Sequence, residues 1–141
     1  MGSILFVESD ADTRERFGAA LRGAGHAVII ASSPAEALVR VSEGGIDVIV
    51  VDSLDPRAGT VELAHNISAL PDAPPLVLMS GSPHAPETSA RIGAAAFLAK
   101  PCEPDELLAA IEPYAGAVRP VRVIDDFGDD EEPTGPARQL G

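Results

Sequence analysis

The sequence predicts an α/β fold in which helices cover both faces of a five-stranded parallel sheet. Five short apolar runs alternate along the chain with five segments of helical periodicity. The third run, residues 46–52, is almost entirely β-branched and ends on Asp52. A strand that is apolar on both faces is typical of the middle of a parallel sheet, so this run is expected at the centre.

The first part of the chain predicts two strand–helix pairs. Residues 4–7 predict a buried first strand, and residues 12–24 carry apolar side chains at helical spacing. Residues 27–31 predict the second strand. Ser33 followed by Pro34 predicts the start of the second helix, because serine caps a helix and proline fits its first position. Two adjacent glycines end that helix before the central strand begins.

The second part repeats the alternation. A third helix is expected over residues 60–70, a fourth strand over 76–80, a short helix over 87–92 and a fifth strand over 95–100. A last helix opens at Pro104 and is expected to end at Pro113, because proline lacks the amide that a helix needs. Crossover handedness and the position of the polar strand ends favour the flavodoxin-like strand order 2-1-3-4-5.

The composition changes at about residue 118. Residues 1–117 are expected to form one domain, and residues 118–141 an acidic Pro- and Gly-rich tail. The run 121–124, Val-Arg-Val-Ile, and Phe127 are the main apolar content of this tail. Two interpretations stay open: a flexible, solubilising tail, or a segment that docks on a partner or on the edge of the sheet.

The totals exclude several classes of protein. The formal net charge of −12 argues against a nucleic-acid-binding surface, which needs a basic patch. A single cysteine, Cys102, excludes an internal disulfide and fits a reducing compartment. No signal-peptide pattern is present and no apolar run approaches the roughly 20 residues of a membrane span. We therefore expect a soluble, cytoplasmic protein that binds neither nucleic acid nor membrane.

Polar side chains follow four of the predicted strands where each strand ends. The set comprises Glu8, Ser9, Asp10, Asp52, Ser80 and Lys100. Because the carboxyl ends of parallel strands meet at one edge of the sheet, these side chains are expected around one pocket. A carboxylate nucleophile, a hydroxyl and an ammonium group together suit phosphoryl transfer.

This pattern resembles the response-regulator receiver domain of two-component signalling, of the stand-alone type found in chemotaxis. The resemblance covers residues 3 to about 116. It rests on the acidic turn after the first strand and on three short segments, which read Val-Val-Asp52-Ser-Leu-Asp-Pro56, Leu-Met-Ser80-Gly-Ser and Ala-Lys100-Pro101.

The resemblance implies a role for each matching residue. Asp52 would accept a phosphoryl group from a phosphohistidine of a sensor histidine kinase, with Ser80 and Lys100 binding the aspartyl phosphate. Ser80 and Phe97 would form the switch. Pro56 matches the family's loop proline, and the bond before Pro101 is often cis in this family.

The resemblance also implies a magnesium ion, held by Glu8, Asp52 and the backbone carbonyl of Leu54. Here the chain departs from the family, because Ser9 stands where a carboxylate usually touches the metal. A hydroxyl is a poorer ligand than a carboxylate, so the Mg²⁺ site is expected to be weakened. Arg57 could pair with Asp52 in place of the metal, or be a solvated loop residue.

Two functions follow as hypotheses. In the first, the chain is a single-domain response regulator that switches protein binding through the face of its fourth helix, fifth strand and fifth helix, at about residues 89–91, 97–99 and 106–110. Its partners would be a sensor histidine kinase or phosphotransfer protein and a downstream target, and it would be a monomer or weak homodimer. In the second, the chain is a pseudo-receiver that binds or localises proteins without phosphorylation.

An enzyme beyond self-phosphorylation and self-dephosphorylation at Asp52 is not expected. Phosphatases of the haloacid dehalogenase type need a second aspartate two residues after the first, where this chain has Leu54. The acidic turn after the first strand would repel the phosphates of a dinucleotide. The histidines His26, His65 and His84 lack the spacing of a metal site.

Overall fold

The structure is a computed structural model that describes residues 2–53, 59–115, 134–135 and 137–139. Five parallel strands form one sheet in the order β2-β1-β3-β4-β5, which confirms the predicted fold. The strands are β1 (Ser3–Val7), β2 (Ala27–Ala31), β3 (Val48–Asp52), β4 (Leu76–Ser80) and β5 (Ala96–Ala99). The helices are α1 (Ala11–Gly23), α2 (Pro34–Ser42), α3 (Thr60–Ser68), α4 (Ala85–Arg91) and α5 (Pro104–Ala115).

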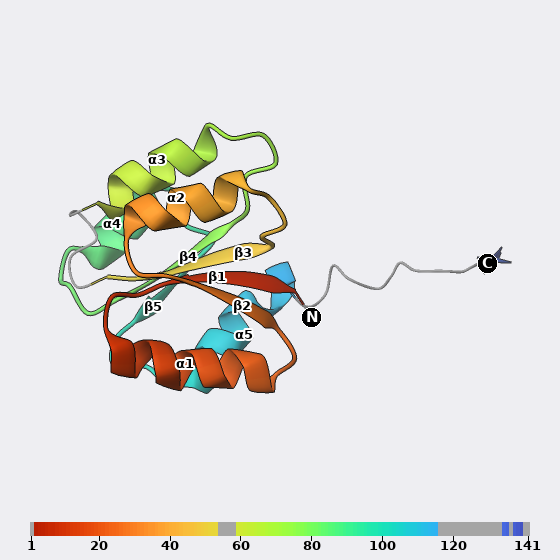
Figure 1. The fold of residues 1–141 in the computed structure, drawn as a ribbon, viewed down its shortest axis with the longest axis horizontal. Helices are drawn as coiled ribbons and strands as arrows, with labels where there is room; N and C mark the ends of the chain where they lie inside the picture. Colours follow the sequence, from red (N-terminus) through yellow and green to blue (C-terminus); the bar gives the residue numbers. More distant parts are fainter. Residues whose placement is uncertain (1, 54–58, 116–133, 136, 140–141) are drawn as a thin grey trace.

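The sheet separates two apolar layers. In Figure 1, α1 and α5 cover one face, and α2, α3 and α4 cover the other. The α1–α5 layer contains Phe6, Phe17 and Leu107, whereas the α2–α3 layer contains Leu5, Leu63 and Leu78. This division follows from the sequence, because successive strand residues point to opposite faces of a sheet.

The central strands have the expected character. The four residues of β3 that precede Asp52 are buried, and so is every residue of β4. The strand begins at Val48 rather than at the predicted residue 46. Asp47 instead donates its amide to the carbonyl of Ser3 at 2.8 Å and accepts the amide of Ser3 on its carboxylate at 2.7 Å.

The predicted start of α2 is confirmed. The Ser33 hydroxyl accepts a hydrogen bond from the amide of Glu36 at 3.2 Å, and Pro34 occupies the first helical position. After the helix, Gly44 and Gly45 have φ values of 86° and 84°, a conformation that other residues rarely adopt.

The predicted end of α5 is wrong. The helix continues through Pro113 to Ala115. Ala115 is fully buried in the α1–α5 layer, and the Tyr114 hydroxyl donates a hydrogen bond to the carbonyl of Ala95 at 3.1 Å. These tertiary contacts hold the last turn, where the amide missing from proline removes a single backbone bond. The short helix α4 likewise begins at Ala85, two residues before the predicted start.

Two further strands, β6 (Thr134–Gly135) and β7 (Ala137–Gln139), pair with each other in the predicted tail. No helix within the described ranges is long and apolar enough to cross a membrane. The predicted docking segment, residues 121–124, lies outside the described residues, as do Leu54, Pro56 and Arg57.

Candidate phosphoacceptor site

The site lies at the carboxyl ends of the strands. Asp52 is the last residue of β3, Glu8 follows β1, and Lys100 follows β5. Parallel pairing of β1 and β4 on either side of β3 brings these ends to one edge of the sheet. A pocket of about 510 Å³ opens there, and its walls include Glu8, Ser9, Asp52 and Lys100.

Asp52 and Lys100 form the closest contact in this pocket. The Lys100 ammonium lies 2.9 Å from each carboxylate oxygen of Asp52. The side chain of Asp52 is only 3% exposed, whereas that of Lys100 is 29% exposed. The cation therefore neutralises an almost buried acid while remaining partly open to solvent. The peptide bond between Lys100 and Pro101 is cis, as the resemblance implied.

Glu8 is the second acid of the site. It is 6% exposed, and its Oε2 accepts a hydrogen bond from the amide of Asp10 at 2.8 Å. Its Oε1 is buried and has no hydrogen-bond partner. Burial, and after it the neighbouring Asp52 carboxylate, raises the pKa of Glu8 from 4.5 to about 7.

The two residues that follow Glu8 do not bring a third carboxylate to Glu8 and Asp52. Ser9 is exposed at the rim of the pocket. Asp10 caps α1, because its Oδ2 accepts hydrogen bonds from the Thr13 amide at 2.8 Å and the Thr13 hydroxyl at 2.7 Å. These bonds lower the pKa of Asp10. Among the described residues, no group of three or more His, Cys, Asp or Glu side chains could hold a metal ion.

Ser80 lies at the end of β4 but not in the wall of the Asp52 pocket. Its hydroxyl accepts a hydrogen bond from the amide of Ser82 at 3.1 Å. The Ser80 carbonyl accepts one from the Lys100 amide, also at 3.1 Å, so the two residues are joined through the backbone. Phe97 is half-buried and packs against the α2–α3 layer.

The pocket also includes hydroxyl side chains that the sequence reasoning did not select. They are Thr13, Ser32, Ser33, Ser53 and Thr60. Ser32 and Ser33 follow β2, so the strand-end rule that selected Asp52 could have found them. Thr60, at the start of α3, carries no comparable signal in the sequence.

The comparisons with known proteins agree with this geometry. The profile of the response regulator receiver domain family matches residues 4–112. Response regulator MprA of Mycobacterium leprae is 29% identical over 119 residues, which cover 83% of this chain and 52% of that protein. The uncharacterized transcriptional regulatory protein YkoG of Bacillus subtilis is 29% identical over 112 residues, which cover 78% and 49%. The chain thus spans about half the length of these curated relatives.

Solved structures share the fold. A putative response regulator from Chloroflexus aurantiacus has a TM-score of 0.72 at 29% identity, covering 80% of this chain and 96% of that one. Chemotaxis response regulator CheY4 of Vibrio cholerae has a TM-score of 0.71 at 24% identity, with 81% and 98% covered. The receiver domain of sensor histidine kinase PA1611 from Pseudomonas aeruginosa, solved with magnesium in its active site cleft, has a TM-score of 0.74 at 22% identity, with 82% and 98% covered. The chain therefore belongs to the response regulator receiver domain family.

Proposed function

We propose that this chain is a phosphorylation-dependent signalling switch in which Asp52 accepts a phosphoryl group from a phosphohistidine of a sensor histidine kinase or phosphotransfer protein. One observation carries the proposal: the Lys100 ammonium lies 2.9 Å from both oxygens of an almost buried Asp52 carboxylate, in a pocket open to solvent. Receiver domains are generally signalling modules rather than enzymes, and the proposal includes no reaction beyond transfer to and hydrolysis at Asp52.

The chemistry follows from the contact between the two side chains. A carboxylate oxygen of Asp52 forms a bond to phosphorus as the bond from phosphorus to the histidine nitrogen breaks, and that nitrogen leaves with the electron pair. Lys100 then offsets the charge of the phosphoryl oxygens, which are held where water is partly excluded.

A magnesium ion belongs to this proposal. The unpartnered Oε1 of Glu8 and the carboxylate of Asp52 are two acidic ligands in the pocket wall, and Mg²⁺ needs only one or two carboxylates with water. When bound, the ion would neutralise phosphoryl charge. Its affinity is expected to be low, because Ser9 supplies no carboxylate and Lys100 already contacts both oxygens of Asp52.

The signal would leave through the surface of α4, β5 and α5. Formation of the aspartyl phosphate would draw the Ser80 hydroxyl away from the amide of Ser82, and Phe97 would move after it. The affected surface includes residues 89–91, 97–99 and 106–110. The proposal places this chain in the cytoplasm, as a monomer or weak homodimer. A downstream protein is its target.

A second candidate is a pseudo-receiver that binds proteins without phosphorylation. The acidic turn favours it, because Ser9 is exposed and Asp10 is committed to capping α1. Phosphorylation by acetyl phosphate, with and without Mg²⁺, separates the two candidates by intact mass. The addition of one phosphoryl group, lost in Asp52→Asn, supports the switch. If the mass of the protein does not increase under any condition, the pseudo-receiver is the candidate that remains.

The same assay tests the role of Ser9. Ser9→Asp restores the carboxylate that the family usually has, so we expect tighter Mg²⁺ binding by at least about tenfold and faster phosphorylation. Ser32→Asp, which follows β2 in the wall of the same pocket, is the matched control for added negative charge. Equal Mg²⁺ affinity of the wild type and Ser9→Asp would contradict the weakened site.

A further inference from the structure

The outer side of β2 is an edge of the sheet that pairs with no other described strand. Its sequence Ala-Val-Ile-Ile-Ala has no charge or proline that would discourage pairing. Ala27 donates its amide toward β1, and the Ala31 carbonyl accepts an amide from the same side. Because successive residues alternate, the amides and carbonyls of Val28 and Ile30 point outward. These backbone groups are available to an added strand.

One side of this edge is apolar and open. Ile29 of β2 is 37% exposed and Val39 of α2 is 56% exposed, and these are the two large apolar side chains that the described residues leave exposed. Ile29 points to the same face of the sheet as Ala31, which packs in the layer of α2. The smaller Ala27, on that face too, is exposed. An added strand would extend this face and cover Ile29 with its own side chains.

The other side of the edge is bordered by one flank of α1. Arg16 pairs with Glu103, the residue before α5, at 2.7 Å, so the flank of α1 that carries Arg16 faces α5. Helical spacing places Arg14 and Arg22 together on the opposite flank, away from α5. This second flank therefore faces the free edge of β2.

Arg14 and Arg22 are available to an acidic group. Within the described part of the chain, neither side chain forms a hydrogen bond or an ion pair. The pKa of Glu36 in α2 is lowered, first by hydrogen bonds from Ser32 and also by the charges of Arg40 and Arg14. Arg14 thus lies toward α2, on the side of β2.

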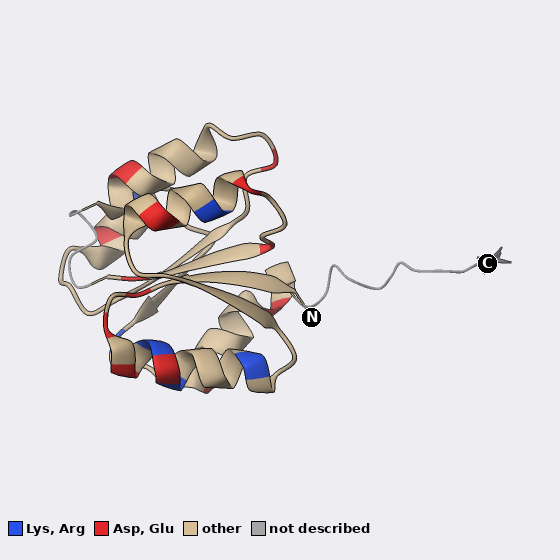
Figure 2. Cartoon of the chain, in the orientation of Figure 1, with Lys and Arg blue, Asp and Glu red and all other residues tan. Residues whose placement is uncertain are grey.

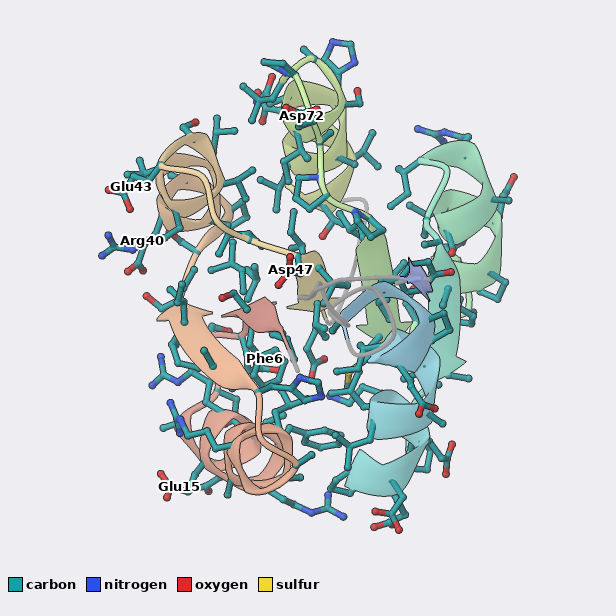
Figure 3. The ribbon with its side chains drawn as sticks, turned by 90° about the vertical axis from the view of Figure 1, so that its right-hand side faces the viewer. Phe6, Glu15, Arg40, Glu43, Asp47 and Asp72 are labelled. Carbon is teal, nitrogen blue, oxygen red and sulfur yellow. The ribbon has the colours of Figure 1, made fainter. Side chains whose placement is uncertain are left out.

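Figures 2 and 3 show the surroundings of this edge. Figure 3 looks along the sheet, with β2 at its outer margin between α1 and α2, and Glu15 of α1 points away from β2. Arg40 of α2 lies 3.3 Å from Glu43 and 3.9 Å from Glu36, so its charge is already balanced within its own helix. Most of the blue segments in Figure 2 lie on α1 and α2, although the chain has a net charge of −12. The two free arginines thus form a basic strip on an acidic protein.

The spacing of these two arginines matches that of an extended strand. Arg14 and Arg22 are eight residues apart, which is about 12 Å along the axis of α1. Residues i and i+4 of a strand lie on one face, about 13 Å apart. Two acids with this spacing would reach both arginines. Residues i+1 and i+3 would then lie on the other face, on the side of Ile29 and Val39.

We infer that β2 binds an extended segment of another protein, which adds to the sheet beside β2 and carries the pattern acid–apolar–any–apolar–acid. The backbone of this segment pairs with Val28 and Ile30. Its two acids bind Arg14 and Arg22, and its apolar residues cover Ile29. The pattern reads the same in both directions, so it suits a parallel and an antiparallel strand. A second copy of the chain is a poorer occupant, because β2 has no acid and two molecules of net charge −12 repel each other.

A synthetic peptide tests the inference on the full-length, unphosphorylated protein. The probe reads Gly-Glu-Val-Thr-Ile-Glu-Gly with both ends blocked. At about 1 mM peptide, the amides of Val28 and Ile30 are expected to exchange with solvent on the order of tenfold more slowly than in the free protein. The amides of Ala27 and Ile29, which point toward β1, serve as the internal reference.

Matched variants test the two arginines by isothermal titration calorimetry. Arg14→Gln and Arg22→Gln are each expected to weaken peptide binding about fivefold, and the double variant at least about tenfold. Arg16→Gln removes the same charge from the opposite flank of α1 and is expected to bind like the wild type. The rearranged peptide Gly-Glu-Val-Thr-Glu-Ile-Gly places its second acid on the other face of the strand, so it is expected to bind at least about tenfold more weakly.

Several outcomes would overturn the inference. Exchange of Val28 and Ile30 that is the same with and without peptide would show that no strand is added. Slow exchange in the free protein would reveal a different occupant: a second copy if protection increases with protein concentration, and a segment of the same chain if it does not. Equal affinity for the two peptides would exclude the proposed pattern. None of these outcomes bears on the proposed phosphorylation, which is measured by mass at Asp52.

Discussion

Asp52 is an acid that is almost completely removed from solvent, and Lys100 is the cation that offsets its charge. The ammonium contacts both carboxylate oxygens, so removing it leaves a buried charge without its ion-pair partner. Removing one partner of a buried ion pair lowers stability by more than the intact pair contributes in net terms, because the remaining charge has already lost its water.

Lys100→Met is therefore expected to lower the free energy of unfolding by on the order of 2 kcal/mol, and to reduce phosphorylation by acetyl phosphate strongly. Urea denaturation at pH 7 measures the first effect and intact mass the second. Asp52→Asn in the Lys100→Met background should recover part of the stability, because no buried charge then remains. Equal stability of Lys100→Met and the wild type would contradict the role given to this contact.

Glu8 makes the stability of the domain depend on pH. Its pKa is raised from 4.5 to about 7, first by burial and then by the neighbouring Asp52 carboxylate. The folded protein holds the proton of Glu8 more tightly than the unfolded chain does, so protonated Glu8 increases the free energy of unfolding. This stabilisation is complete below pH 4.5 and is lost as the pH rises through about 7. The pKa of His26 is lowered by burial, so His26 contributes in the opposite direction over part of this range.

Glu8→Gln is expected to remove the pH-dependent contribution of Glu8 to the free energy of unfolding. Between pH 5 and pH 8, the free energy of unfolding of the wild type should fall relative to that of the variant by on the order of 1–3 kcal/mol. Urea denaturation across this range measures the difference, and comparing the two proteins cancels the effect of His26. A difference that stays constant with pH would mean that Glu8 is ionised throughout.

Among the helices, α2 shows how local chemistry fixes an element. Ser33 caps its first turn, Pro34 follows, and Glu36 accepts hydrogen bonds from the amide and hydroxyl of Ser32. All of these interactions lie within five residues, so the sequence alone was enough to predict the helix start.

Ser33→Ala is expected to lower the free energy of unfolding by about 1 kcal/mol, because the amide of Glu36 loses its acceptor. Chemical denaturation at constant pH measures the change. Ser42→Ala is the matched control: that hydroxyl donates to the carbonyl of Leu38 in the last turn of the same helix and is exposed, so its loss should change stability little. A similar cost at both positions would argue against a specific cap.

The end of α5 shows what local reasoning cannot predict. Pro113 predicted the end of the helix, which is wrong, because the burial of Ala115 and the hydrogen bond of Tyr114 to Ala95 depend on residues distant in sequence. The same limit applies in the site. Strand ends predicted one pocket for six residues, and five of them line it, whereas Ser80 does not; the six are Glu8, Ser9, Asp10, Asp52, Ser80 and Lys100. Strand ends did not predict that the Ser80 hydroxyl would bond to Ser82, or that the buried Thr60 would line the wall.

At the scale of the whole molecule, the sheet joins two apolar layers into one body. The alternation of residues along β1, β3 and β4 places neighbours such as Leu5 and Phe6 in different layers. The fold class and strand order were predictable because this pattern, repeated five times, is compatible with few topologies. Damage to either layer is therefore expected to affect the stability of the whole domain.

Leu78→Ala tests this expectation in the α2–α3 layer. Leu78 is fully buried in β4, so the truncation should cost about 3 kcal/mol through lost burial and the remaining cavity. Val39→Ala, on an exposed position of α2, should cost well under 1 kcal/mol. Thermal unfolding followed separately by far-UV and near-UV circular dichroism should give one midpoint in each variant. Two separate midpoints would show that the layers unfold independently.

Gly2 has a practical consequence for anyone who produces this protein. A side chain at this position would meet the Ala115 carbonyl at 2.7 Å and the Asp47 carboxylate at 2.8 Å, both of which belong to well-packed parts of the domain. An affinity tag or fusion partner that begins upstream of Met1 leaves this junction intact. A cloning scar that replaces Gly2 with a larger residue would instead force the first strand away from the last helix.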